Sequence, residues 1–363
     1  MTIGIDARAA TEVPAGRGRL VRELLRALAA REDGAHRYRL YARTAWRETE
    51  LDERFSWSLI EGRDPWWHVR AARRANRECD VFLSSNSYLT IWFLRIPGVP
   101  VVYDLAAFEP TMRPNLRSTV IERLTLGHAV RRSAAFVAIS QATADALVAH
   151  WPQAAARTTV ALLGPVSAPR QALTAEEAAA LPQPGFVLAV GTIEPRKNLP
   201  RLVAAYRTLA PELQRRHPLV VVGELGWETG ETLDALRSLG ERCLMLGYVS
   251  DTALLELYRR CGVFCYPSLG EGFGLPVLEA MAAGAPVLTS KLSSLPEVGG
   301  EAATYVDPLD TAAISAGLER VLTDAALGER MRAAGPVRAR EFSWARFAET
   351  TLAVLDQAAS KRS

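Results

Sequence analysis

Short apolar runs alternate with amphipathic segments along most of the chain. The apolar runs are typical of buried parallel strands, and between them apolar residues recur at helical spacing, as in residues 17–30, where Leu20, Leu24 and Leu28 share one face. The strands predicted in the first half are residues 3–6, 38–41, 55–60, 81–83, 99–103, 136–139 and 158–162. Strands that alternate with helices predict an α/β fold built on a parallel sheet.

A second alternating series follows a change of composition. Residues 164–185 contain prolines at both ends of an alanine-rich stretch, which is typical of a connection between domains. The strands predicted after it are residues 186–190, 219–222, 243–246, 263–266, 287–289 and 304–306. We therefore expect two doubly wound, Rossmann-like domains, with ligands bound in the cleft between them at the carboxyl ends of the strands. The expected boundaries are residues 1–165, a linker at 166–184, and residues 185–344.

The stretch of residues 268–298 carries most of the candidate chemistry. It joins two predicted strands through a glycine-rich loop, and Pro276 suits the first turn of the helix that follows. The amides and dipole of a helix start favour a phosphate or a similar anion. Glu271 and Glu279 flank this start, and carboxylates are good acceptors for the vicinal hydroxyls of a sugar or ribose. An anion site between two hydroxyl acceptors predicts a sugar nucleotide as the ligand.

Further candidates follow other strands of the second domain. Arg196 and Lys197 come shortly after a strand that ends at Gly191, where two cations could neutralise a diphosphate leaving group; a solvated basic pair is the alternative. The two strands after it are followed by Glu224 and by the turn that contains Tyr248 and Val249. Backbone and apolar side chains at such turns can contact a nucleobase, although a plain turn explains Glu224 equally well.

The first domain offers two glycines and one acid. Gly16 and Gly18 follow the first strand, where glycine lets the backbone approach an anion, although an ordinary tight turn fits as well. They do not complete the GxGxxG fingerprint, so a dinucleotide site is disfavoured. Tyr103 and Asp104 end another strand, and Asp104 could accept a hydrogen bond from a sugar hydroxyl. A capping role is the main alternative for this aspartate.

Composition narrows the function classes. The 363 residues are 49% hydrophobic and carry a net charge of +3, so bulk electrostatics do not call for nucleic acid. The chain has no apolar run of the ~20 residues that a membrane-spanning helix needs, and no basic and apolar leader is apparent. Its four cysteines lie in apolar segments without a second pair at zinc spacing. We expect a cytoplasmic protein with reduced thiols and no metal site.

One predicted helix, which is rich in arginine, is the main candidate for binding to a membrane surface. It begins with Trp66 and Trp67 and places four arginines on one broad side: Arg70, Arg73, Arg74 and Arg77. This arrangement suits an anionic membrane surface with tryptophan at the headgroup level. A solvated helix with its tryptophans in the core is equally consistent with the pattern.

Taken together, these residues resemble the retaining GT-B glycosyltransferases of family 4. The segment EGFGLPVLE matches that family's E-x7-E motif, and GTIEPRKN, GYVSD, SSLPEVGG and FSW look like its other motifs. The resemblance covers nearly the whole chain. It is strongest in the second domain, which looks most like bacterial mannosyltransferases that build O-antigen or exopolysaccharide from GDP-mannose.

The resemblance implies a GT-B fold and specific roles. Glu279 would bind the ribose hydroxyls, Glu271 the donor sugar, and Lys197 with Arg196 the leaving diphosphate. The C-terminal helix, residues 345–363, would cross back onto the first domain. Gly16 would lie near the phosphates and Val249 near the base. The segment between the two glutamates would also contact the substrate, through Gly272, Phe273, Gly274 and Leu275.

Two positions depart from the family pattern. Many relatives carry arginine after the glycine of the phosphate motif, where this chain has Thr192, and Arg196 could take over that role. Many also carry histidine before the aspartate of the first domain, where this chain has Tyr103, whose phenol can hydrogen-bond a sugar hydroxyl.

The resulting hypothesis is a metal-independent, retaining hexosyltransferase without a cofactor. Mannose from GDP-mannose is the first choice of donor, and a glycan or a polyprenyl-diphosphate-linked saccharide is the expected acceptor. The reaction would take place in the cytoplasm, on the inner face of the plasma membrane. The alternatives are a UDP- or ADP-sugar transferase of the same fold, a GT-B phosphorylase or epimerase, and a non-catalytic scaffold that binds sugar nucleotides.

Overall fold

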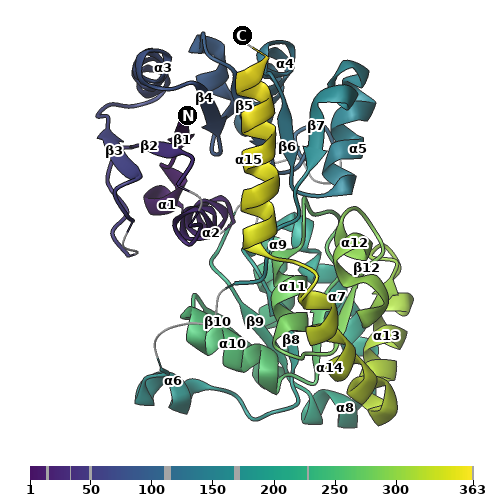
Figure 1. The fold of residues 1–363 in the computed structure, drawn as a ribbon. Helices are drawn as coiled ribbons and strands as arrows, with labels where there is room; N and C mark the ends of the chain where they lie inside the picture. The colour runs from purple at the N-terminus through teal and green to yellow at the C-terminus, as the bar shows by residue number, and fades with distance from the viewer. Residues whose placement is uncertain are drawn as a thin grey trace. The chain divides into compact units, whose positions relative to one another are not determined.

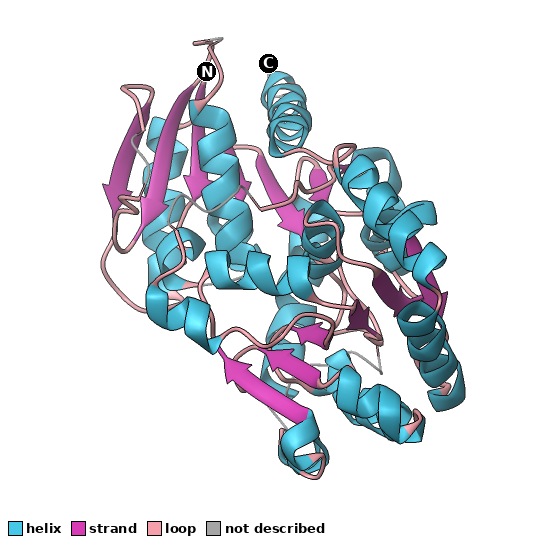
Figure 2. Ribbon diagram, turned by 90° about the horizontal axis from the view of Figure 1, so that it is seen from below, coloured by secondary structure: helices cyan, strands magenta, loops and turns pink. Residues whose placement is uncertain are grey.

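The computed structural model describes residues 1–13, 16–32, 34–48, 51–109, 116–166, 172–226 and 229–361. The chain divides into two compact units, Met1–Gly164 with Ser343–Ser363, and Pro165–Phe342 (Figure 1). Each unit is a parallel sheet with helices packed against it (Figure 2). Within the described ranges, no helix combines the length and the hydrophobicity that a bilayer crossing requires.

In the described part of unit 1, seven strands form one parallel sheet in the order β3-β2-β1-β4-β5-β6-β7. The strands are β1 (Thr2–Asp6), β2 (Arg37–Ala42), β3 (Phe55–Leu59), β4 (Val81–Ser84), β5 (Gly98–Val102), β6 (Phe136–Ala138) and β7 (Thr158–Val160). The chain builds outward from β1 to β3 and then returns to β4 on the other side of β1. This reversal is the doubly wound topology that the sequence predicts, and ligands bind where such a sheet reverses.

The helical segments described in unit 1 are α1 (Ala9–Glu12), α2 (Arg17–Ala29), α3 (Trp66–Glu78), η1 (Tyr88–Phe93), α4 (Leu116–Arg132), α5 (Gln141–His150), η2 (Pro152–Arg157) and α15 (Trp344–Ser360). The C-terminal helix α15 begins at the capping hydroxyl of Ser343, which accepts a hydrogen bond from Arg346 N at 3.1 Å. Its buried face, which includes Phe347, Leu352 and Leu355, packs against α2 and the strands β4 to β6.

In unit 2, six strands of the described residues form a parallel sheet in the order β10-β9-β8-β11-β12-β13. They are β8 (Val187–Val190), β9 (Leu219–Val222), β10 (Cys243–Gly247), β11 (Val263–Tyr266), β12 (Val287–Ser290) and β13 (Ala303–Val306). The inner strands β9, β11 and β12 are buried along their whole length, which explains their nearly continuous apolar sequences. The order reverses between β8 and β11, so a ligand is expected at the carboxyl ends of these two strands.

The helical segments of unit 2 surround this sheet. They are α6 (Ala175–Ala180), η3 (Pro195–Lys197), α7 (Leu199–Thr208), α8 (Pro211–Arg216), α9 (Gly230–Arg237), η4 (Gly240–Arg242), α10 (Asp251–Arg260), α11 (Leu275–Ala282), α12 (Leu295–Gly299), η5 (Gly300–Ala302), α13 (Thr311–Thr323) and α14 (Ala325–Ala339). The alanine-rich part of the expected linker is helix α6, which Thr174 and Glu177 start as a capping box.

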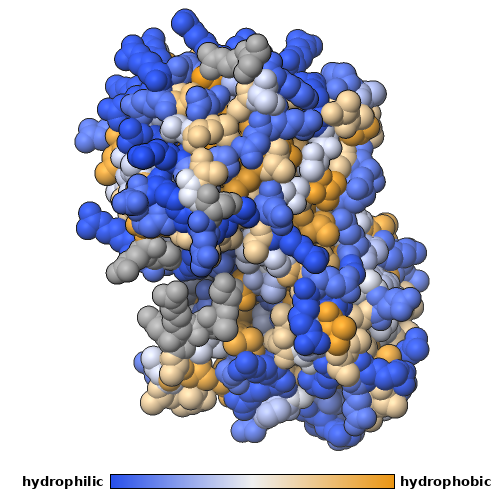
Figure 3. Space-filling model, in the orientation of Figure 1, coloured by the Kyte–Doolittle hydropathy of each residue, from blue (hydrophilic) through white to orange (hydrophobic). Residues whose placement is uncertain are grey.

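The structure shows that one of the residues expected to contact a membrane, Trp67 on α3, is not on the surface. Trp67 is fully buried beneath the guanidinium of Arg8, whose Cζ lies 3.7 Å from the centre of a Trp67 ring, so this tryptophan cannot reach a headgroup. Arg8 is itself buried and pairs with Asp6 at 2.9 Å. Trp66 is 66% exposed, and the four arginines of α3 are exposed as well. Hydrophilic side chains cover the part of unit 1 where α3 lies (Figure 3).

Candidate active site

Glu271 is the centre of a polar cluster at the carboxyl end of β11. Its side chain is 8% exposed, and its Oε1 accepts hydrogen bonds from Tyr266 OH at 2.8 Å and Ser268 Oγ at 2.7 Å. Lys197 Nζ lies 2.7 Å from the same oxygen, while the guanidinium of Arg196 pairs with Oε2. The structure therefore brings together the three charged residues that the sequence singles out, and adds Tyr266 and Ser268.

The loop that carries Glu271 is fixed by hydrogen bonds on both sides. Toward η3, Leu269 N donates to Arg196 O at 2.9 Å. Toward the segment after β12, Glu271 N donates to Ser293 Oγ at 2.9 Å, and Ser294 Oγ donates to Glu271 O at 2.9 Å. The two serines lie within a family motif, but the sequence alone assigns them no role, because their contacts appear only when β11 and β12 lie side by side.

Backbone conformation at β8 and β9 places Lys197 beside this loop. Gly191 has φ +135° and Gly223 has φ +145°, and a Cβ on Gly223 would lie only 2.1 Å from Gly191 O. Glycine at position 223 therefore lets the two strand ends approach each other. Asn198 adopts a left-handed φ of 60° and donates from its side chain to Pro267 O at 3.0 Å, which holds the turn after Lys197 against the end of β11.

The charges of the cluster balance one another. Burial alone would raise the pKa of the Glu271 carboxyl, but the adjacent Arg196 and Lys197 cations outweigh burial and lower this pKa to about 2. Burial lowers the pKa of Lys197, and the Glu271 carboxylate opposes that shift. Arg196 also pairs with Glu194 at 2.6 Å, so two cations meet two carboxylates. At neutral pH, Glu271 is an ionised hydrogen-bond acceptor and not a proton donor.

Glu279 lies in the second turn of α11, past the loop that holds Glu271. Its side chain is largely buried, and Tyr258 OH donates to its Oε2 at 3.3 Å. The helix starts at Gly274, which has a left-handed φ of +102°, and continues from Leu275. The loop residues Gly272 and Phe273 lie just before this start, with Phe273 buried edge-on against Phe342.

The expected nucleobase contacts lie on the neighbouring strands. Glu224 is exposed after β9, and its carbonyl accepts a hydrogen bond from Ile193 N at 2.8 Å. Tyr248, which is 67% exposed, and the half-buried Val249 follow β10. These residues share the carboxyl edge of the sheet with Glu271 but are not among the contacts described for its carboxylate.

The candidates from the first strands belong to unit 1. Gly16 starts α2 with φ +52°, and a Cβ on Gly18 would lie 1.8 Å from Val13 O, so Gly18 is explained by the close packing of α1 on α2. Asp104 Oδ1 accepts a hydrogen bond from Ala106 N at 3.0 Å, a local contact at a turn and not at a helix start. Tyr103 OH donates to Ser85 O at 2.5 Å. Among the described residues, no three His, Cys, Asp or Glu side chains gather as metal ligands would.

Comparison with known proteins identifies the domain that holds the Glu271 cluster. Residues 174–338 match the family described as "Glycosyl transferases group 1". This segment is a group 1 glycosyltransferase domain. Part of the chain is homologous to O-antigen mannosyltransferases of Escherichia coli. It is 45% identical to O-antigen chain mannosyltransferase B over 166 residues, 44% of this chain and 42% of that protein. It is 38% identical to the serotype-specific mannosyltransferase WbdA over 174 residues, 46% of this chain and 21% of that protein.

These matches span less than half of the length of either relative. The fold extends further: a sucrose-phosphate synthase from Thermosynechococcus elongatus aligns with 99% of this chain and 100% of its own, with a TM-score of 0.75 and 20% identity. The two parallel-sheet, Rossmann-like domains thus have the GT-B fold, as expected from the sequence. At this identity, the likeness to the synthase shows the fold alone.

Proposed function

We propose that the protein is a retaining glycosyltransferase that moves a hexose from a nucleotide sugar to a glycan or lipid-linked saccharide. The observation that carries the proposal is the ionised Glu271 carboxylate, which Lys197, Tyr266 and Ser268 hold at the end of β11, directly before the helix α11. A hydroxyl acceptor beside a helix start is the chemistry that a sugar nucleotide needs.

In this proposal, the donor's phosphates lie at the start of α11 and near Lys197. The ammonium has three N–H donors, and its described contacts with Tyr266 and Glu271 use two of them, so the third can reach a phosphate oxygen. Arg196 already contacts Glu194, Gly270 and Glu271. We therefore assign Arg196 to positioning Glu271, and Lys197 to the diphosphate, where a positive charge stabilises the leaving group without a metal ion.

The two glutamates would divide the donor between them. Glu271 would accept hydrogen bonds from hydroxyls of the transferred sugar, because its low pKa keeps it ionised. Glu279 would accept them from the ribose. The attacking hydroxyl of the acceptor would lose its proton to an oxygen of the departing phosphate, so this scheme requires no side-chain nucleophile.

Mannose from GDP-mannose is the donor that we favour, with cell-surface polysaccharide as the product. The support is that the two E. coli relatives are named as mannosyltransferases, one of them for the O-antigen chain. UDP- and ADP-sugars are the competing donors. The shift in melting temperature that each nucleotide or nucleotide sugar causes shows which donor the protein binds, since a ligand that binds only the folded state stabilises that state. We expect GDP and GDP-mannose to raise the melting temperature in the presence of EDTA; failure of all GDP, UDP and ADP compounds to do so would contradict a nucleotide-sugar site.

Replacing Glu279 with alanine is expected to raise the KM for the donor roughly tenfold to a hundredfold, because a hydrogen bond to a charged group contributes about 1.5–3 kcal/mol. The KM for the acceptor should not change. Initial-rate kinetics measure both constants. Tyr258→Phe is the matched control, because it removes the phenol that contacts Glu279 Oε2 and keeps the carboxylate. An unchanged donor KM in Glu279→Ala would remove Glu279 from the site.

We also propose that α3 attaches the protein reversibly to the inner face of the plasma membrane. The exposed Trp66 and the exposed Arg70, Arg73, Arg74 and Arg77 support this proposal, without Trp67. Neutralising the four arginines to glutamine should weaken binding to vesicles that contain anionic lipid at least tenfold, since each basic residue near such a surface contributes about 1 kcal/mol. Sedimentation with these vesicles measures the change. The double variant R215Q/R216Q, on an exposed part of α8, is the control, and equal binding by all variants would refute the attachment.

A further inference from the structure

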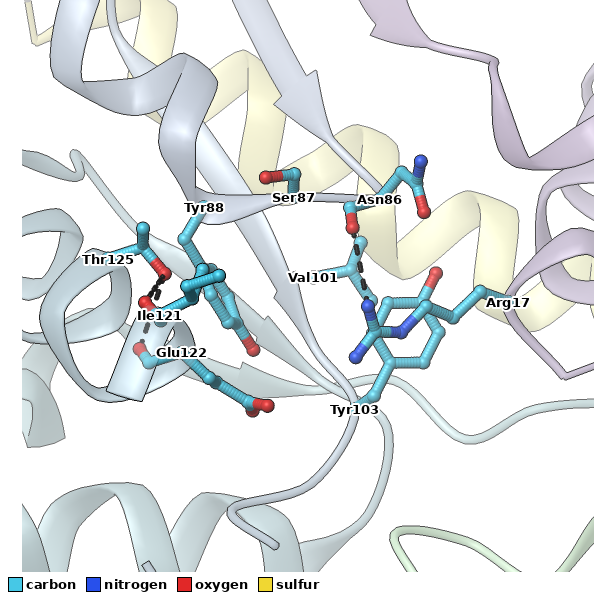
Figure 4. Close-up of a pocket in the computed structure, with 9 residues that line it drawn as sticks. All are labelled: Arg17, Asn86, Ser87, Tyr88, Val101, Tyr103, Ile121, Glu122 and Thr125. Carbon is cyan, nitrogen blue, oxygen red and sulfur yellow. Dashed lines mark hydrogen bonds between the residues drawn. The ribbon is translucent and has the colours of Figure 1, made fainter. Parts of the chain in front are cut away.

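A pocket with several polar side chains lies within unit 1, at the carboxyl ends of β4 and β5 (Figure 4). This open pocket has a volume of ≈ 210 Å³, smaller than the roughly 300–1,000 Å³ of sites for drug-sized ligands, so a ligand about the size of one sugar ring would suit it. Its walls come from the start of α2, the segment after β4, the end of β5 and helix α4. The polar residues among them are Arg17, Asn86, Ser87, Tyr88, Tyr103, Glu122 and Thr125.

The carboxyl group of Glu122 has an unusual environment. Its Oε1 is shielded from solvent and has no hydrogen-bond partner among the described residues. Burial and the nearby Asp104 raise the pKa of this carboxyl to about 7, although Arg17 opposes the shift. Folded proteins satisfy nearly all of their buried polar atoms, so an unpartnered carboxyl oxygen in a pocket points to a ligand that supplies the missing donor.

Arg17 lies across the pocket from Glu122 (Figure 4). Its guanidinium stacks over the ring of Tyr103, with Cζ 5.0 Å from the ring centre, and donates to Asn86 O at 3.4 Å. The salt bridges of the described residues do not include an Arg17–Glu122 pair, although both side chains line the same pocket. The ligand must therefore suit a carboxylate and a guanidinium together.

Hydroxyl groups meet this requirement. A hydroxyl both donates and accepts, so neighbouring hydroxyls of one ring can donate to Glu122 and accept from Arg17. A charged group would be attracted by one of these two side chains and repelled by the other, whereas hydroxyls suit both of them. Within the function proposed above, we propose that this pocket binds the acceptor sugar as an uncharged ring, and that Glu122 accepts a hydrogen bond from its hydroxyls and thereby sets acceptor specificity.

The binding of this sugar should depend on pH with a defined sign. The charged and titratable groups beside Glu122 are Arg17 from α2, Tyr88 from η1 and Asp104 after β5, and Tyr103 lines the same pocket. Burial raises the pKa values of both tyrosines, so they stay neutral. Raising the pH through about 7 ionises Glu122 and makes it a better acceptor, so binding of the sugar should strengthen between about pH 6 and about pH 8.

The test measures the binding of simple sugars to the full chain by saturation-transfer NMR. This measurement does not depend on catalytic turnover. The probes are the methyl glycosides of mannose, glucose and galactose, with mannose 6-phosphate and mannosamine as the charged counterparts. We expect at least one neutral glycoside to bind at least tenfold more tightly than either charged sugar. We also expect Glu122→Ala and Glu122→Gln to weaken that binding about tenfold or more and to abolish its pH dependence.

Two further readouts separate the possible outcomes. Glu349→Gln, on the exposed side of α15, is the matched control and should bind the glycoside as the unmodified protein does. Glu122→Gln should melt no lower than the unmodified protein at about pH 8, because it removes a poorly solvated charge, whereas a structural glutamate would lower the melting temperature when replaced. The inference is overturned if no neutral glycoside binds, if the Glu122 variants bind normally, or if they lose binding only together with stability. Stabilisation by a GDP, UDP or ADP compound reports separately on the nucleotide site of unit 2, so the failure of all of these compounds to stabilise the protein would instead refute the proposed function.

Discussion

Replacing Lys197 with alanine is expected to lower the turnover number for sugar transfer about 10²–10³-fold, the usual cost of removing one donor that stabilises developing negative charge. In the proposed site, Lys197 is the cation with an N–H left for the leaving diphosphate, since Arg196 is already held by two carboxylates. The measurement is the initial rate with saturating GDP-mannose, alongside a thermal melt that shows the variant is folded.

Lys291 provides the matched control for this experiment. It is also a lysine of unit 2, but its side chain is 55% exposed and pairs with the exposed Asp307 at 3.1 Å. A surface pair of this kind contributes little, so Lys291→Ala should retain nearly normal turnover. If Lys197→Ala transferred sugar as fast as Lys291→Ala, Lys197 would have no part in the reaction.

Replacing Glu271 with glutamine is expected to abolish transfer and also to lower the free energy of unfolding by about 3 kcal/mol, because the variant leaves the buried ammonium of Lys197 without its charged partner. Breaking a buried ion pair from one side has a cost of this size. Urea unfolding near neutral pH measures the change. A fully stable Glu271→Gln protein would mean that the charge on Glu271 does not stabilise the native cluster.

The pH dependence of stability gives this prediction a second test. The pKa of Glu271 is lowered to about 2 in the folded protein from an ordinary value of 4.5, so its stabilising effect is present above about pH 4.5 and is lost as the pH falls toward 2. Between about pH 5 and about pH 3, the difference in unfolding free energy between the unmodified protein and Glu271→Gln should shrink by about 2 kcal/mol. A difference that stays constant over this range would contradict the ionised state of Glu271.

The architecture could be predicted from sequence because parallel strands buried on both faces have a distinctive composition. Short apolar runs rich in β-branched and aromatic residues, such as those of β9 and β11, are typical of such strands. The positions of Glu271 and Lys197 were also predictable, because each follows a predicted strand, and the strands of a parallel sheet end at a common edge.

The contacts within the site could not be predicted in the same way. Arg196 and Lys197 suggested two cations for a diphosphate, whereas the structure pairs them with Glu194 and Glu271 in a balanced cluster. Glu194 lies two residues before Arg196, but sequence spacing does not show that a turn will bring their side chains together. The role of Tyr266 was missed for a related reason, since it looked like the last apolar residue of a strand.

Two features of unit 1 could not be predicted because they depend on how a helix is rotated against the sheet. Trp66 and Trp67 are adjacent, so they point about 100° apart around α3, and only the packing decides which one enters the core. The sequence did not single out Glu122 as a candidate site residue, because a glutamate on a predicted helix is usually solvated. Its place in a pocket with Arg17 depends on how α4 and the start of α2 meet around the sheet.

The central claim is that the Glu271 cluster transfers a sugar from a nucleotide donor. The most direct measurement incubates the protein with GDP-mannose labelled with ¹³C at the anomeric carbon and a mannoside acceptor, and follows the labelled carbon by NMR. We expect a new glycoside with the anomeric configuration of the donor, formed at similar rates by the unmodified protein and by Lys291→Ala, and about 10²–10³-fold more slowly by Lys197→Ala. The absence of transfer from GDP-, UDP- and ADP-hexoses alike, or equal product from Lys197→Ala, would contradict this claim.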